Sequence, residues 1–199
     1  GITASDKTYD GSVTATMDGT AAVYSGLVSG DTFDGSYTGA FSNANVGSGK
    51  TVTITSSYSG ADVNNYTVTN QSSTTAHITA KALTATASTA NKTYDGGTTA
   101  TTTLTFTGLV GSETLGQTVG STFDNKNVGS NKTVTVNSIT LADGSNGGLA
   151  ANYSISTGQT TTANVTAKSL TVSGITASNK TYDGNAVATL NTGLVAYSG

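Results

Sequence analysis

The chain has 199 residues and a net charge of −3, with eight lysines, no arginine, and no cysteine, proline or tryptophan. Eight lysines spread along the sequence give no clustered cations, which disfavours nucleic-acid binding, and no apolar run is long enough to predict a membrane-spanning segment. The absence of cysteine excludes disulfide bonds and thiolate metal ligands.

The composition favours strands and turns. Thr is abundant and prefers strands, while Gly, Asn, Asp and Ser prefer turns, and helix formers such as Glu, Gln and Met are scarce. A disordered Ser/Thr-rich linker is the rival interpretation. Regular patterning within the sequence argues against it.

Apolar and polar residues alternate with a period of two in several segments, which indicates strands with one buried face. In chain order, the alternating residues are Val52 and Ile54, Tyr66 and Val68, Ala76, Ile78 and Ala80, and Val134 and Val136. Turn-forming clusters separate these segments, at Asp10-Gly11, Ser29-Gly30-Asp31, Gly47-Ser48-Gly49 and 143–148. We therefore expect an all-β fold with at most one short helical turn per repeat.

The sequence repeats itself. The pentapeptide Lys-Thr-Tyr-Asp-Gly begins at Lys7, Lys92 and Lys180, so successive copies are 85 and 88 residues apart. Further landmarks follow in the same order, and they are Gly26-Leu27-Val28 with Gly108-Leu109-Val110, Asn45-Val46-Gly47 with Asn127-Val128-Gly129, Lys50–Ile54 with Lys132–Val136, Asn65-Tyr66 with Asn152-Tyr153, and Ile78–Leu83 with Val165–Leu170. Self-similarity at a fixed period indicates a tandem array of small domains.

These landmarks predict a first repeat over residues 1–82, a second over 83–169 and the start of an incomplete third over 170–199. Each complete repeat is expected to be a small β-sandwich or β-grasp-like module. The linkers near Lys81 and Lys168 are one or two residues long, which predicts a semi-rigid, elongated rod. Since residues 1–6 resemble 174–179, the array could also alternate two kinds of domain.

The pentapeptide is best interpreted as a structural turn. Asp-Gly favours a tight turn, Lys can pair with Asp on the surface, and Tyr can pack its ring on the core while its hydroxyl stays in solvent. The residues assigned to this landmark are Lys7, Tyr9, Asp10 and Gly11, then Lys92, Tyr94, Asp95 and Gly96, then Lys180, Tyr182, Asp183 and Gly184.

The pentapeptide, together with the Gly-Leu-Val, Asn-Val-Gly and Asn-Tyr landmarks, resembles the YDG repeats of bacterial exported proteins, which occur beside MBG-type repeats in filamentous-haemagglutinin-like adhesins. The resemblance covers both complete repeats and the start of the third. It implies a stalk module of a secreted or cell-surface adhesin, and it supplies no catalytic site.

The sequence also contains candidate residues for two stabilising features. One is a Lys–Asn isopeptide bond, for which the matched candidates are Lys50 and Lys132, Lys81 and Lys168, Asn65 and Asn152, with Asp10 and Asp95 as the assisting acids. The other is structural calcium, for which the nearest oxygen-rich pairs are Asp31 with Asp34 and Asp124 with Asn127. The pattern otherwise predicts no cofactor and no metal site.

Catalysis is not expected. His77 is the single histidine and should face solvent from its strand, and the second repeat has Asn164 in its place. One histidine and no cysteine leave no nucleophile–base pair that could recur in the array. Six glycosylation sequons, beginning at Asn65, Asn91, Asn131, Asn152, Asn164 and Asn179, largely reflect the Asn- and Thr-rich composition.

Two functions follow from these observations. In the first, the repeats are a stalk that projects a distal binding region and contacts neighbouring repeats of the same chain. In the second, the repeats themselves bind, either to other copies through sheet edges that no proline blocks, building a fibre or biofilm matrix, or to glycans. Glycan binding would require exposed aromatic residues, and Tyr24, Tyr37, Tyr58 and Tyr197 are the tyrosines outside the landmarks.

Overall fold

The computed structural model describes residues 1–199 and is all-β, as the patterning predicted. It contains no α-helix, and each complete repeat has a single 3-10 turn, η1 (Val63–Asn65) and η2 (Ala150–Asn152). A β-grasp needs a helix across its sheet, so that alternative is not the arrangement found. No helix has the length and hydrophobicity that crossing a membrane requires.

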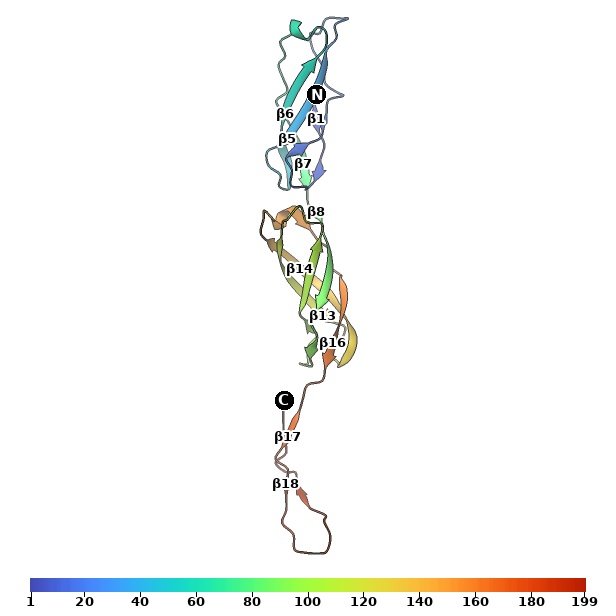
Figure 1. Ribbon diagram of the computed structural model, residues 1–199, viewed down its shortest axis with the longest axis vertical. Helices are drawn as coiled ribbons and strands as arrows, with labels where there is room; N and C mark the ends of the chain where they lie inside the picture. Colours follow the sequence, from blue (N-terminus) through green and yellow to red (C-terminus); the bar gives the residue numbers. More distant parts are fainter. The chain divides into compact units, whose positions relative to one another are not determined.

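The first repeat is built on a five-stranded sheet in the order β2-β7-β6-β5-β3, with a separate two-stranded ladder β1-β4. Figure 1 shows β5, β6 and β7 side by side. The strands are β1 (Thr3–Ala4), β2 (Lys7–Thr8), β3 (Thr14–Ala15), β4 (Met17–Asp18), β5 (Asp34–Phe41), β6 (Gly47–Ser59) and β7 (Ser73–Thr79).

The N-terminal hairpin of this repeat nearly closes the sheet. At the open end of this hairpin β1 pairs with β4. Towards its tip the two arms part, so that β2 pairs in parallel with β7 and β3 pairs antiparallel with β5. β1 also lies beside β7 and β4 beside β5. Both edges of the sheet are therefore covered by the same hairpin, which leaves little unpaired edge.

The second repeat has the same order, with a five-stranded sheet β10-β16-β14-β13-β11 and a ladder β12-β9. Its strands are β9 (Thr84–Thr89), β10 (Lys92–Thr93), β11 (Thr99–Ala100), β12 (Thr102–Thr107), β13 (Leu115–Phe123), β14 (Gly129–Asp143), β15 (Tyr153–Ser154) and β16 (Thr160–Thr166). β8 (Lys81–Ala82) precedes this set and pairs in parallel with β15.

The turn predicted at Gly47-Ser48-Gly49 is wrong, because these residues lie inside β6 as a β-bulge. Gly47 pairs with Ile78 and Lys50 with Ala76, so β6 has one more residue than β7 in this stretch. Gly49 has a φ of 58°, a left-handed conformation that glycine adopts at low cost. A Gly-Ser-Gly segment is compatible with a turn or with a β-bulge. The segment is a bulge here because the residues on both sides of it pair with β7.

The strand predicted at Tyr66 and Val68 is also wrong. Residues 66–70 follow η1 without regular secondary structure, whereas the matched Tyr153 begins β15. β15 is a strand because β8 supplies a hydrogen-bonding partner for its backbone. In the first repeat no strand lies beside residues 66–70.

Buried residues at alternating positions form the cores. Two clusters are buried, one containing Tyr9, Ala15, Phe41, Val52, Ala76, Ile78, Leu83 and Tyr153, the other Ala100, Phe123, Val134, Ala163 and Val165. Val52 and Val134 are fully buried at the matched centres of the two sheets. Burial of such side chains is worth about 1.5–3 kcal/mol each.

The chain forms two compact units that do not coincide with the repeats. The first unit contains residues 1–86, 104–119 and 138–158, which is the first repeat with one end of the second. The other unit contains 87–103, 120–137 and 159–199. Residues 170–199 contribute two short ladders, β17 (Thr171–Ser173) with β20 (Ala196–Ser198) and β18 (Thr176–Ala177) with β19 (Leu190–Asn191), and bury no side chain.

Candidate functional site

The pentapeptide forms a turn that its lysine holds closed. Lys7 Nζ lies 2.7 Å from Asp10 Oδ1 and donates to the carbonyl oxygens of Ser12 (2.8 Å) and Thr14 (3.2 Å). The Ser12 amide donates to the same Asp10 oxygen at 2.8 Å. Nζ also lies 5.7 Å from the centre of the Phe41 ring, a cation–π distance. The lysine therefore bridges the turn to the core.

The other copies of the pentapeptide keep this geometry. Lys92 pairs with Asp95 at 2.7 Å, and Lys180 pairs with Asp183 at 2.6 Å. Hydrogen bonds from Lys92 and from the Gly97 amide lower the pKa of Asp95. Gly11, Gly96 and Gly184 all have positive φ, from 73° to 82°, which the turn requires.

The tyrosine of the first copy, Tyr9, forms a hydrogen bond with the second repeat. The ring of Tyr9 is buried, and its hydroxyl donates to Glu113 Oε1 at 2.6 Å, so the expectation of a hydroxyl in solvent is wrong for this copy. Tyr153 donates to the other oxygen of the same carboxylate at 2.6 Å, and the two rings meet edge to face at 5.4 Å. Burial and the Glu113 hydrogen bond raise the pKa of Tyr9 to about 12.

The Asn-Val-Gly and Asn-Tyr landmarks meet beside this pair. Asn152 is 1% exposed, and its Oδ1 accepts the Val46 amide at 2.9 Å while its Nδ2 donates to Asn45 Oδ1 at 3.1 Å. The carbonyl and the amino group of this buried side-chain amide are thus both hydrogen-bonded to the first repeat. Val46 packs against the same buried cluster as Val110.

These contacts define two ends for each repeat. We call the motif end the one that carries the pentapeptide and Asn-Val-Gly, and the acceptor end the one that carries Gly-Leu-Val, the following acid and Asn-Tyr. The motif end of the first repeat packs on the acceptor end of the second, and both lie in the first compact unit. The linker is part of the contact, since Leu83 is buried and its amide donates to the Ser154 carbonyl at 2.8 Å.

The first repeat has the same acceptor end. Tyr66 donates to Asp31 Oδ2 at 2.6 Å and accepts the Val28 amide at 3.0 Å, as Tyr153 does with Glu113 and the Val110 amide. The hydrogen bond to Asp31 raises the pKa of Tyr66. The arrangement is a property of the repeat, and it forms whether or not a motif end covers it.

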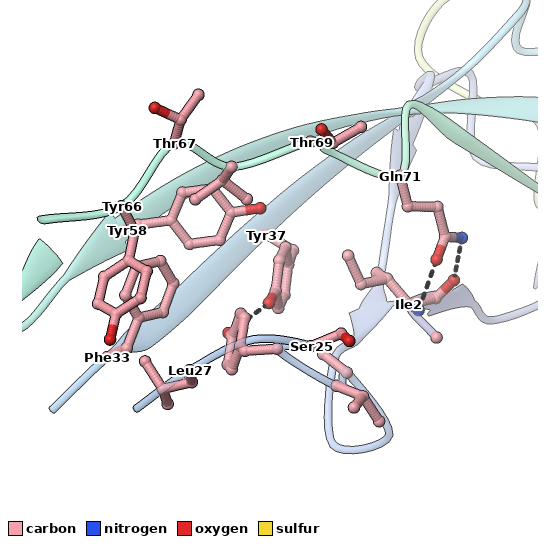
Figure 2. Close-up of a pocket in the computed structure, with 15 residues that line it drawn as sticks. Ile2, Ser25, Leu27, Phe33, Tyr37, Tyr58, Tyr66, Thr67, Thr69 and Gln71 are labelled. Atoms are coloured by element: carbon pink, nitrogen blue, oxygen red, sulfur yellow. Dashed lines mark hydrogen bonds between the residues drawn. The ribbon is translucent and has the colours of Figure 1, made fainter. Parts of the chain in front are cut away.

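Beside this acceptor end lies a pocket of about 420 Å³ with aromatic walls. Figure 2 shows the rings of Phe33, Tyr58 and Tyr66 grouped at one side and Gln71 bound to the backbone of Ile2 at the other. Its aromatic residues are Tyr24, Phe33, Tyr37, Tyr58 and Tyr66. Three of the four tyrosines singled out for glycan binding therefore converge here, and the fourth, Tyr197, does not line the pocket.

The side chains considered for an isopeptide bond are not brought together as nominated. Lys50 Nζ and Lys132 Nζ each lie 2.6 Å from an asparagine oxygen, but the partners are Asn43 and Asn125. Asn152 is engaged with the motif end of the first repeat, and Asp10 and Asp95 are engaged with the lysines of their own turns.

The residues considered for calcium serve other contacts. Asp31 binds the Tyr66 hydroxyl, and Asp124 pairs with Lys132 at 2.9 Å, which lowers the pKa of Asp124. No group of three His, Asp or Glu side chains lies close enough together to hold a metal ion. His77 is exposed, as expected, and its Nδ1 accepts the Gly49 amide at 3.1 Å, so it supports the bulge.

Sequence reasoning named Asp31 only in a turn and as a calcium candidate, and it missed Glu113 and the role that these two acids share as acceptors for the landmark tyrosines. They differ in type and so were not seen as a landmark, yet both stand three residues after the valine of Gly-Leu-Val. It also missed Phe33, which lies in no alternating segment.

The comparisons with known proteins agree with the repeat geometry. The YDG domain family matches the chain twice, over residues 1–76 and 79–163. No curated protein and no solved structure matches the chain. The two matched segments cover most of the sequence and contain both copies of every landmark except Ile78–Leu83 with Val165–Leu170, and the chain therefore belongs to the YDG domain family.

Proposed function

We propose that this chain is a structural stalk repeat of a secreted or cell-surface bacterial adhesin, and that it projects a distal binding region rather than carrying out catalysis. The observation that supports this most is the contact between the motif end of the first repeat and the acceptor end of the second. Its polar members are hydrogen-bonded and largely buried, and the same residue types recur in both repeats.

A stalk must resist bending, and contacts between consecutive repeats add to the resistance of a short linker. Here the linker strand β8 is hydrogen-bonded to β15 of the second repeat, and Tyr9, Glu113 and Asn152 fasten the two ends around it. Bending would have to break these contacts, so the repeats are proposed to form a semi-rigid, elongated rod.

Pulsed electron spin resonance tests the proposal. The chain has no cysteine, so Thr38→Cys and Thr133→Cys place one spin label on an exposed strand position of each repeat. A rod predicts one narrow distance distribution, which broadens when Tyr9→Phe and Asn152→Ala are added. A broad distribution in the otherwise unaltered chain would show that the repeats move freely, and the stalk proposal would fail.

A further inference from the structure

The first and last parts of each repeat are joined by a parallel pair of strands. In the first repeat β2 pairs in parallel with β7, the last strand of the sheet along the chain, and the linker strand β8 follows β7. In the second repeat β10 pairs in parallel with β16 in the same way. Each pair therefore connects the part of a repeat that the chain enters with the part that it leaves.

Further hydrogen bonds extend this pairing on both sides of the two ladder residues. In the first repeat the His77 amide donates to Asp6 Oδ1 at 2.7 Å, just ahead of β2. The Tyr9 amide, just after β2, donates to the Thr79 carbonyl oxygen at 2.9 Å. Thr79 Oγ1 donates in turn to the Lys7 carbonyl oxygen at 3.3 Å. The segment 6–9 is thus bonded to β7 along its whole length.

The second repeat has the same bonds at the matched positions. The Asn164 amide donates to Asn91 Oδ1 at 2.7 Å, and the Tyr94 amide donates to the Thr166 carbonyl oxygen at 2.8 Å. Thr166 Oγ1 donates to the Lys92 carbonyl oxygen at 3.3 Å. We call this arrangement the clamp, and it comprises segment 6–9 with residues 77–79 in the first repeat and segment 91–94 with residues 164–166 in the second.

The lysine of the pentapeptide fixes the clamp to the turn that follows it. Lys92 Nζ lies 2.7 Å from Asp95 Oδ1 and donates to the carbonyl oxygens of Gly97 (3.0 Å) and Thr99 (3.1 Å). It also lies 5.8 Å from the centre of the Phe123 ring. Thr99 belongs to β11, which pairs with β13 at the other edge of the sheet. If β10 slid along β16, it would have to break these contacts as well.

The direction of the two strands determines how tension acts on the clamp. Tension along the chain enters a repeat through its first strands and leaves it through its last strand. Because the clamp strands run in the same direction, tension draws them past each other along their length and loads their evenly spaced hydrogen bonds together. In an antiparallel pair both loaded ends would lie at the same end of the pair, and the bonds would break one after another.

We propose that each repeat withstands tensile force through its clamp, and that the pentapeptide lysine and the residue before it, Asp6 or Asn91, carry part of this force. The source of the tension rests on the proposed function, because a stalk that holds a distal binding region transmits any pull on that region to every repeat. The clamp itself lies within one repeat and does not depend on the contact between repeats.

Optical tweezers applied to the full chain test the direction of the load. The chain has no cysteine, so two introduced cysteines define the points of attachment. The sliding pair, Ser88→Cys with Ala167→Cys, draws β10 and β16 past each other, and the opening pair, Gly97→Cys with Ala167→Cys, separates the same strands from one end. All three positions are exposed. The force that unfolds the second repeat should be several-fold larger for the sliding pair.

Two matched substitutions separate the load on the clamp from general stability. Asn91→Ala removes a clamp acceptor, whereas Asn137→Ala removes one side-chain hydrogen bond, to Thr122 at 2.9 Å, between strands outside the clamp. Asn91→Ala should lower the unfolding force of the sliding pair and leave that of the opening pair unchanged, because this bond lies at the end of the clamp that opens last. Asn137→Ala should leave both forces unchanged.

Two results would overturn the proposal. They are equal unfolding forces for the sliding and opening pairs, and an equal loss of force in Asn91→Ala and Asn137→Ala. Circular dichroism of each variant confirms that the fold is retained. A broad distance distribution in the spin-label experiment, together with a larger force for the sliding pair, would support the clamp while the stalk proposal fails.

Discussion

The hydroxyl of Tyr9 provides a selective test of the contact between repeats. Tyr9→Phe removes one oxygen and keeps the ring that packs against Tyr153. The lost hydrogen bond is short, 2.6 Å, and its acceptor is the Glu113 carboxylate. Hydrogen bonds to charged groups contribute about 1.5–3 kcal/mol, and since Glu113 is only half-buried we expect the lower end of that range.

Urea unfolding followed by circular dichroism measures this loss. With a dependence of about 2 kcal/mol per molar urea, a loss of about 1.5 kcal/mol lowers the midpoint by roughly 0.7 M. Tyr94→Phe is the matched control, because its tyrosine occupies the same turn without a repeat packed on it, and it should change stability by less than about 0.5 kcal/mol. Equal shifts for the two variants would refute the reasoning, as would a double-mutant cycle that shows no coupling between Tyr9→Phe and Glu113→Gln.

Two further predictions concern ionisation and covalent chemistry. Burial raises the pKa of Tyr9 and of Tyr37 to about 12, so between about pH 10 and 12 the folded chain keeps protons that the unfolded chain loses, and its free energy of unfolding should fall by up to about 1.4 kcal/mol per pH unit for each tyrosine. A profile in urea that is flat across this window would contradict the desolvation and hydrogen bonding of these two tyrosines. Lys132 lies close to Asn125, but its other partner Asp124 has a lowered pKa and stays ionised, so it cannot supply the protonated acid that an isopeptide bond requires. Intact mass spectrometry should therefore give the mass of the sequence, and a deficit of one ammonia would show that the bond forms.

The sheets were predictable because their residues carry a local signal. Val52 and Ile54, like Val134 and Val136, alternate with polar residues, and this period is enough to indicate strands with a buried face. The bulge at Gly49 was not predictable, since its only local signal is shared with turns. Its identity depends on a partner strand that lies far along the sequence.

The landmark residues could be found in the sequence, but the contact that they form between repeats could not be predicted from it. Several landmarks form the two faces of the contact, but repetition alone does not say whether a residue serves its own fold or its neighbour's. Tyr9 and Asn152 illustrate this, since each is a landmark whose hydrogen bonds cross to the other repeat. The acid that accepts from the tyrosine of Asn-Tyr is Asp31 in the first repeat and Glu113 in the second, so matching by residue identity overlooked it.

The landmark residues fasten one repeat to the next, and the exchange rate of the Val46 amide proton reports on this contact directly. This amide donates to Asn152 across the contact, while the matched amide of Val128 has no repeat packed over it. Hydrogen exchange measured by nuclear magnetic resonance at low protein concentration should show slow exchange at Val46, fast exchange at Val128, and fast exchange at Val46 once Asn152→Ala is introduced. If the Val46 amide exchanges as fast as that of Val128 in the unaltered chain, the landmarks do not join the repeats.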